Sequence, residues 1–306
     1  MERTVCVLIL PLFSLLLCNG AKGSDTFELP RNIEQASSLQ MEEVNIGGQK
    51  RYRILTDHYD ITASQCEDGI LASERLEHLF HAWKLLSAEF FKETKNESAS
   101  YRHRIILYRN KQEYMVNLQR FDPLIARTNG FYYPPRKMAY FFSSETKVLF
   151  HEGTHQIFEE YLFREKKPIF RNNFWAVEGI ALFIETLQIE EQSYKVGNLL
   201  DDRLYAAKVY QFQQNYNLPI RKLTAMSAAE IKPRADIVKI YSQSATLVYW
   251  LMFAEEGRYR KPLFELLHQT YLDSAKPETL SELTGLPYEE LDKKYMEFLK
   301  TIPDEL

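Results

Sequence analysis

The stretch His151-Glu-Gly-Thr-His155 lies within a run from Thr146 to Tyr161 that predicts one amphipathic helix. Residues four positions apart lie on the same face of a helix, one turn apart, so both imidazole rings can reach one metal ion. Glu152 follows the first ligand directly, and it therefore lies beside the metal rather than on it. Two neutral nitrogen ligands, with a carboxylate that takes a proton from a water, are the arrangement that a zinc hydrolase needs.

The pentapeptide alone does not decide the function. With 7 His and 31 Glu in 306 residues, a chance match to H-E-x-x-H has a probability of about 0.02 if positions are independent. The alternative is a buried helix with two hydrogen-bonded histidines. Gly153 costs a helix about 1 kcal/mol relative to Ala, which indicates close approach of a neighbouring segment.

A third ligand is predicted downstream. The run Phe174–Glu185 is strongly apolar, and Glu178 is a lone charge near its start with apolar residues on the same face. An ionised carboxylate on an apolar face is costly unless it is paired or coordinated. The polar, proline-containing linker 164–173 can turn the chain back, so that this second helix brings Glu178 to His151 and His155.

These residues resemble a known family. H-E-x-x-H followed, 23 residues after the second His, by Glu in a Trp-x-x-Glu-Gly-x-Ala setting is similar to the gluzincin metallopeptidases, and most of all to their peptidase-MA-like branch, which includes an uncharacterised bacterial domain family. The likeness spans roughly residues 51–300 and is strongest at 148–185. It implies one zinc ion per chain held by His151, His155 and Glu178, with Glu152 as general base.

The same resemblance implies a substrate strand. Residues 130–142 predict a hairpin with Pro-Pro-Arg-Lys at its turn, and in gluzincins a strand at this place binds the peptide main chain. Gly130, Phe131 and Tyr132 are the corresponding candidates, although their aromatic rings fit an ordinary core equally well. The Gly-x-Met-Glu-Asn stretch of the related aminopeptidases is missing from this sequence, which argues against simple aminopeptidase activity.

The resemblance also implies an oxyanion donor. Tyr241, 63 residues after Glu178, stands at a distance similar to that of the tyrosine that donates to the tetrahedral intermediate in gluzincin aminopeptidases. Tyr249 is the alternative. In several gluzincins an acidic residue one turn after the third ligand orients a ligand histidine, but here that position is Leu182. Glu185, Glu159 or a backbone carbonyl is then left for the supporting role.

The N-terminal residues 1–23 have the pattern of a secretory signal: Arg3, an apolar core too short to span a membrane, and then small residues at 20–24, with cleavage after Gly20 or Gly23. An uncleaved membrane anchor and a lipid anchor on Cys18 are the alternatives. We expect a secreted, periplasmic or cell-envelope protein. Cleavage would leave Cys66 alone, and a buried inert thiol is expected there.

The composition excludes several classes of protein. Hydrophobic residues make up 45% and charged residues 26%, as in ordinary globular domains. A formal net charge of -4 without a long basic run argues against nucleic acid and anionic membranes as partners. After the signal no other stretch has the length and apolarity of a membrane span. The expected partner is a peptide or protein substrate.

The whole pattern predicts an α+β, zincin-like, two-lobed fold. Residues 24–50 are expected to be a loosely ordered leader, 51–192 an N-terminal lobe with a small mixed sheet and the two metal helices, and 193–306 a mostly helical lobe. Short strands are predicted at 52–55 and 103–108, with a turn at 56–60, and a connector is predicted at 218–223. A long helix is predicted at 70–91. His78 and His81 lie on it, and we interpret them as a solvated or half-buried face because no carboxylate stands out as a partner.

The sequence therefore predicts an exported zinc-dependent peptidase that hydrolyses peptide bonds with an activated water and Glu152 as general base. Two alternatives remain at this level. One is a non-catalytic binding or scaffold protein with a zincin fold at the cell surface, and the intact Glu152 speaks against it. The other is a structural helical domain in which the pentapeptide occurs by chance.

Overall fold

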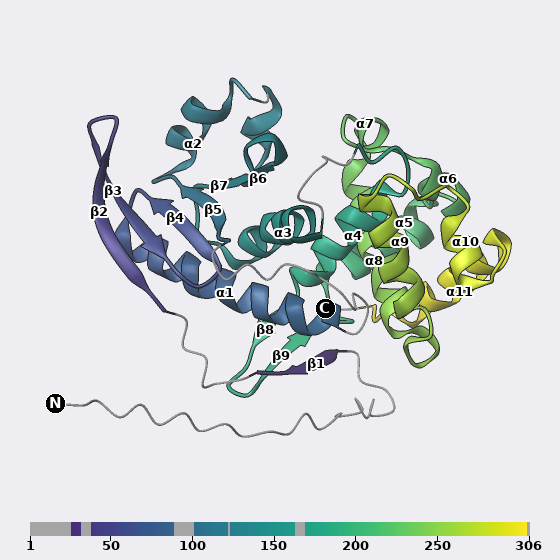
Figure 1. Ribbon diagram of the computed structural model, residues 1–306. Coiled ribbons are helices and arrows are strands. Elements are labelled where there is room, and N and C mark those ends of the chain that lie inside the picture. Colours follow the sequence, from purple (N-terminus) through teal and green to yellow (C-terminus); the bar gives the residue numbers. More distant parts are fainter. Residues whose placement is uncertain (1–25, 32–37, 89–100, 122, 163–168, 305–306) are drawn as a thin grey trace.

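The computed structural model describes residues 26–31, 38–88, 101–121, 123–162 and 169–304. The predicted signal segment and Cys18 lie outside these residues. The described chain is α+β, with a mixed sheet in its N-terminal half and a group of helices in its C-terminal half (Figure 1). No helix of this part of the chain is long and apolar enough to cross a bilayer.

A six-stranded mixed sheet forms the centre of the N-terminal half. Its strand order is β2-β3-β4-β5-β7-β6, which leaves β6 at one edge. The pairs β4–β5 and β5–β7 are parallel, and the other neighbours are antiparallel. The six strands are β2 (Gln40–Ile46), β3 (Gln49–Leu55), β4 (Tyr59–Ala63), β5 (His103–Leu107), β6 (Gly130–Tyr133) and β7 (Met138–Phe141).

Helices cover both faces of this sheet. Helix α1 (Cys66–Ala88) makes the crossover between the parallel strands β4 and β5, and it packs beside α3 (Thr146–Ile157) (Figure 1). Alternate residues of a strand point to opposite faces. Ile105 of β5 therefore joins the main core with α1 and α3, while Ile106 packs into a smaller core with α2 (Lys111–Leu118).

The strands predicted from the sequence at 52–55, 103–108 and 130–142 are present, the last as the β6–β7 hairpin with a short 3-10 turn at Pro134–Arg136. The interpretation of residues 56–60 as a turn is only partly right, because β4 begins at Tyr59 and pairs with both β3 and β5. The alternation of buried and half-buried residues in β4 covers only Tyr59–Ala63, which is too short to stand out in the sequence. Its partner β5 lies more than forty residues later.

The expected leader at 24–50 contains two strands, so its description as loosely ordered is wrong where the structure describes it. β2 pairs with β3 through a two-residue turn at Gly47 and Gly48, whose positive φ angles suit glycine. β1 (Phe27–Pro30) pairs with β9 (Ser193–Val196), which also pairs with β8 (Gln188–Ile189). This small sheet ties the N-terminal residues to the segment after α4.

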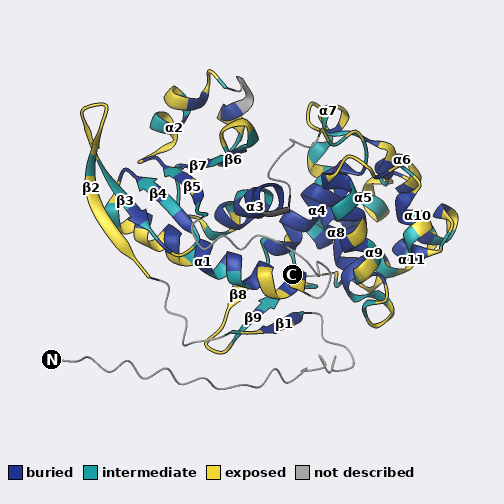
Figure 2. Cartoon of the chain, viewed as in Figure 1, coloured by how far each residue is buried: buried dark blue, intermediate teal, exposed yellow. Residues whose placement is uncertain are grey.

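The thiol of Cys66 also departs from expectation. Cys66 is half-buried rather than buried, because β2, against which it rests, is an exposed edge strand (Figure 2). Its Sγ lies 3.1 Å from Sδ of Met41 on that strand.

The C-terminal half is helical, as predicted. The stretch 218–223, expected to be a connector, instead contributes most of a short helix, since Pro219 precedes Ile220 at the start of α6. The helices are α4 (Phe174–Ile184), α5 (Asp202–Gln214), α6 (Ile220–Ala225), α7 (Ala228–Ile231), α8 (Ile237–Gly257), α9 (Arg260–Tyr271), α10 (Thr279–Thr284) and α11 (Tyr288–Thr301). Helix α4 is buried along its whole length (Figure 2).

Two glycines set how closely the helices approach. A Cβ on Gly153 would lie 2.6 Å from Cδ2 of Leu79, so this glycine allows α3 to pack tightly against α1. A Cβ on Gly179 would lie 2.7 Å from the backbone oxygen of Ser244, so α4 lies directly against α8. The close neighbour predicted from Gly153 is thus helix α1.

Candidate metal centre

Helix α3 presents two histidines on one face. His151 and His155 are four residues apart, and their Nε2 atoms lie 3.2 Å from each other. The rings meet edge to face, with centroids 4.8 Å apart. Both side chains are half-buried. The face that carries them is turned toward α4, which packs against α3.

Helix α4 brings a carboxylate to these two nitrogens. Oε2 of Glu178 lies 3.5 Å from Nε2 of His151 and 3.7 Å from Nε2 of His155. Ligands of a tetrahedral zinc ion with bonds of about 2.0–2.1 Å are about 3.3 Å apart. The three atoms therefore have the spacing of three ligands around one ion, and the sequence-predicted ligands are brought together.

The electrostatics of this cluster are those of a buried carboxylate between two imidazoles. Burial alone would raise the pKa of Glu178, but the charges and hydrogen bonds of His155 and His151 outweigh it and hold this pKa well below its usual range. Burial alone would lower the pKa of His151, but the hydrogen bonds to Glu178 and Glu185 raise it to about 10.

A second acidic residue supports His151 from behind. Nδ1 of His151 lies 2.7 Å from Oε1 of Glu185, which follows the last residue of α4. A ring that donates its Nδ1–H keeps its Nε2 lone pair free for a metal. Arg203 of α5 lies 3.6 Å from the other oxygen of Glu185. Of the supporting groups considered from the sequence, the structure thus places Glu185 on His151.

Glu152 lies beside the three candidate ligands and contacts the edge of the sheet. Its Oε2 accepts a hydrogen bond of 2.9 Å from the backbone N–H of Tyr132 on β6. A Cβ on Gly130 would lie 3.0 Å from Cγ of Glu152 and 2.8 Å from Val148, so only glycine allows β6 to approach α3 this closely.

The three substrate-strand candidates occupy different environments. The ring of Tyr132 is buried in the main core, and Phe131 packs into the smaller core beside Tyr133. Gly130 lies next to Glu152. The aromatic side chains of β6 pack alternately into the two cores. The strand therefore contacts the candidate centre through its backbone and not through aromatic rings.

The two tyrosines considered as oxyanion donors lie in different surroundings. Tyr241 lies in the first turns of α8, and burial followed by the charge and hydrogen bonding of Glu178 raises the pKa of Tyr241. Its hydroxyl group is thus beside the carboxylate of Glu178, the third predicted ligand. Tyr249, two turns further on, is buried and packs against the rings of Phe253 and Phe298.

One group of residues was missed by reasoning from the sequence. His81 lies one helical turn after Glu77 on α1, and both are close to His58. The interpretation of His81 as having no carboxylate partner is therefore wrong. The signal was present in the i, i+4 spacing of Glu77 and His81, but His58 lies far away in the sequence. His78 instead bonds the hydroxyl group of Tyr194 at 3.1 Å.

Comparison with known proteins adds no family to this picture. No protein-family model matches the chain, and no curated protein matches it at a significant level. The candidate function is therefore argued from the residues and their geometry.

Proposed function

We propose that this protein is an exported zinc-dependent peptidase of the gluzincin type. The observation that carries the proposal is the convergence of Nε2 of His151, Nε2 of His155 and Oε2 of Glu178 within 3.2–3.7 Å of one another. Imidazole nitrogens and a carboxylate oxygen are the ligands of hydrolytic zinc sites, which keep a fourth position open.

The proposal assigns to the residues around this cluster the roles that hydrolysis requires. When bound, zinc supplies Lewis acidity, which polarises a carbonyl group and makes a water molecule more acidic. Glu152 takes a proton from the attacking water as the water oxygen bonds to the carbonyl carbon. The same carboxyl group then gives that proton to the amine nitrogen as the carbon–nitrogen bond breaks.

In this proposal Tyr241 acts on the oxygen of the scissile carbonyl, and its position beside Glu178 supports that role. Charge develops on that oxygen only in the transition state, so a hydroxyl donor held nearby accelerates the reaction without tightening substrate binding. A raised pKa keeps the hydroxyl group of Tyr241 protonated and able to donate.

The peptide specificity is supported by the sheet edge. β6 is one of the two edge strands of the six-stranded sheet, and Glu152 accepts a hydrogen bond from its backbone at Tyr132. An extended peptide can add to such an edge through main-chain hydrogen bonds, which bring its carbonyl groups past Glu152. Export is inferred from the signal pattern of residues 1–23.

The experiment that tests the proposal compares metal content and cleavage. The chain without residues 1–23 is purified without chelator beside His151→Ala, and zinc per chain is measured in both. A difference of one zinc per chain, with cleavage of a mixed peptide library by the wild type alone, is expected. Equal zinc contents would refute the metal centre. Zinc bound at this centre with no peptide cleaved would favour the non-catalytic binding protein.

A further inference from the structure

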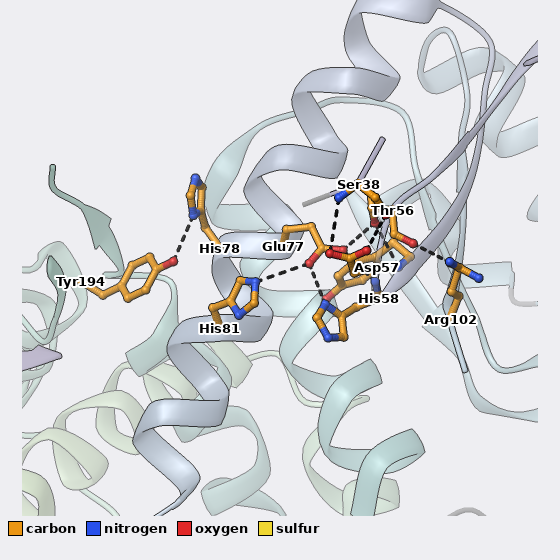
Figure 3. A network of polar contacts seen from close by, with 10 residues as sticks. Ser38, Thr56, Asp57, His58, Glu77, His78, His81, Arg102 and Tyr194 are labelled. Carbon is orange, nitrogen blue, oxygen red and sulfur yellow. Dashed lines mark hydrogen bonds and ion pairs between the residues drawn. The ribbon is translucent and has the colours of Figure 1, made fainter. Parts of the chain in front are cut away.

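A second set of ligand-type atoms converges away from the centre on α3 and α4. Nδ1 of His58 lies 2.7 Å from Oε2 of Glu77, and Nε2 of His81 lies 3.8 Å from the same oxygen (Figure 3). His58 belongs to the turn between β3 and β4, whereas Glu77 and His81 lie one turn apart on α1. One candidate ligand atom from each of the three residues lies within 4.8 Å of the others.

The carboxylate of Glu77 is held in one orientation. Its Oε1 accepts hydrogen bonds from Oγ1 of Thr56 at 2.5 Å and from the backbone N–H of His58 at 2.8 Å. The other oxygen, Oε2, is therefore the one that faces the two imidazoles. The side chain of Glu77 is only 5% exposed, so rotation into solvent is not open to it.

The two rings are held as well. The ring of His58 stacks on Phe80 with centroids 3.9 Å apart, and it meets the ring of His81 edge to face at 5.4 Å. Nearby polar groups are engaged elsewhere. The carboxylate of Asp57 accepts a hydrogen bond of 2.5 Å from the hydroxyl group of Ser38, and His78 points away from the cluster toward Tyr194 (Figure 3).

We propose that His58, Glu77 and His81 form a second, independent site for a divalent transition-metal ion, with zinc as its occupant. Two imidazole nitrogens and one carboxylate oxygen suit zinc, whereas calcium and magnesium prefer sites made of oxygen ligands. The two imidazoles are 29% and 24% exposed in their side chains, so a water molecule can complete the coordination from the solvent side.

The distances show what an ion would change. Ligands around tetrahedral zinc are about 3.3 Å apart. The His58–Glu77 pair, at 2.7 Å, would open slightly as the ion replaces the proton of its hydrogen bond, and the His81–Glu77 pair, at 3.8 Å, would close by a similar amount. Both shifts are small for side chains whose backbones lie in regular or hydrogen-bonded segments.

This second site has a structural consequence. An ion held by all three residues joins the turn after β3 to the middle of α1, and so fixes the sheet to that helix. The neighbouring residues Leu76 and Leu79 face Gly153 of α3. Metal at this site would therefore stabilise the helix on which the HExxH helix rests, although the two sites share no ligand.

The experiment measures zinc stoichiometry and affinity by titration calorimetry on the chain without residues 1–23. The wild type should bind two zinc ions, and His151→Ala should retain the ion at the second site. Adding His81→Ala to His151→Ala should abolish this remaining binding. His78→Ala, which removes a histidine from the same helix, is the matched control and should lose no zinc.

A second variant tests whether a loss of zinc results from misfolding and not from a missing ligand. His58→Phe keeps an aromatic ring for the stack on Phe80 but removes Nδ1, and it should lose the same ion. Zinc should raise the unfolding midpoint of His151→Ala by about 5 °C at saturating concentration, and magnesium should not. This rise should vanish with His58→Phe.

Three results would overturn the second site: no zinc bound by His151→Ala, zinc retained after both His81→Ala and His58→Phe, or equal loss with His78→Ala. These results differ from a failure of the first metal centre, in which the wild type would bind a single ion that His81→Ala removes and His151→Ala leaves in place. They differ also from zinc bound at both sites without peptide cleavage, which would refute only the peptidase activity.

Discussion

Nδ1 of His151 lies 2.7 Å from Oε1 of Glu185, so a carboxylate at the end of α4 orients the first histidine of the HExxH helix. Glu178, the third proposed ligand, is on the same helix seven residues earlier. Helix α4 therefore carries the proposed third ligand, and the residue directly after its last turn contacts the first proposed histidine ligand. Displacement of α4 would disturb both together.

We predict that Glu185→Ala weakens zinc binding at the first site by about 10- to 100-fold, because the supporting partner of a ligand histidine sets its orientation and basicity. Glu185→Gln keeps an acceptor oxygen without the charge, so its zinc affinity should lie between those of the wild type and Glu185→Ala. Zinc affinity of each folded variant is measured by competition with a chelator. Glu191→Gln, at an exposed position on the following turn, is the control, and an unchanged affinity in Glu185→Ala would contradict the supporting role.

Glu152→Gln should retain zinc and lower peptide hydrolysis by about 10²- to 10⁴-fold, the range contributed by a positioned general base. Gln keeps the hydrogen bond from the backbone of Tyr132 but cannot take a proton. Cleavage rates are measured on zinc-loaded protein. Glu145→Gln, at the exposed start of the same helix, should behave as wild type. Full activity of Glu152→Gln would refute the proposed role of Glu152 as general base.

Tyr241→Phe should lower kcat by about 10²- to 10³-fold with zinc content unchanged, since an oxyanion donor acts only in the transition state. Tyr249→Phe provides the comparison. Its ring packs between Phe253 and Phe298, so the loss of its hydroxyl group should leave kcat near wild type. The opposite pattern would assign the donor role to Tyr249.

Gly179→Ala should destabilise the fold by about 1–3 kcal/mol, the usual cost of overpacking. The added methyl would meet backbone oxygen of Ser244 at 2.7 Å, and a backbone atom cannot move aside as a side chain can. Gly153→Ala meets only the ends of two leucine side chains and gains about 1 kcal/mol of helix propensity, so its net cost should be smaller. Urea unfolding measures both, and an equal cost would contradict this difference.

The buried pair of Glu160 and His103 predicts a loss of stability in acid. Burial alone would raise the pKa of Glu160, but hydrogen bonds from His103, at 2.9 Å, and Tyr101, at 2.6 Å, outweigh it and lower this pKa below 4.5. A carboxyl group with a depressed pKa contributes stability above its unfolded value and loses that contribution as the pH falls through its folded value.

The corresponding test uses Glu160→Gln. At pH 7 this change should lower the free energy of unfolding by about 1–3 kcal/mol, because buried donors lose a charged acceptor. Below pH 4.5 the difference from wild type should shrink. Unfolding curves from pH 7 to pH 3 measure it, with the exposed Glu297→Gln as control. If the difference in unfolding free energy between wild type and Glu160→Gln stays constant across this range, the ionised Glu160 carboxylate does not cause the loss of stability in acid.

Local patterns in the sequence were sufficient for several elements. The helices of the HExxH stretch and of Glu178, and the hairpin at 130–142, each have a periodicity or turn signal within a few residues, and all three are present. The strands within 24–50 were missed. β1 depends on pairing with β9 more than 160 residues later, and no short window of sequence contains that partner.

The candidate site also combines features that the sequence predicts with features that only the tertiary structure shows. The residue types, the four-residue spacing of His151 and His155, and the lone charge at Glu178 can be read from the sequence because the geometry of a helix is local. The choice of Glu185 as supporting group, the place of Tyr241 beside Glu178, and the meeting of His58 with Glu77 and His81 were decided by tertiary structure.

The physical reason is packing between segments distant in the sequence. Gly179 allows α4 to lie against α8, which brings Tyr241 to the third ligand, and the β3–β4 turn meets α1 only because β4 pairs in the sheet that α1 covers. The sequence by itself therefore determined which side chains are candidates for binding a metal and for moving a proton. The close approach of helices and strands decided which of them meet.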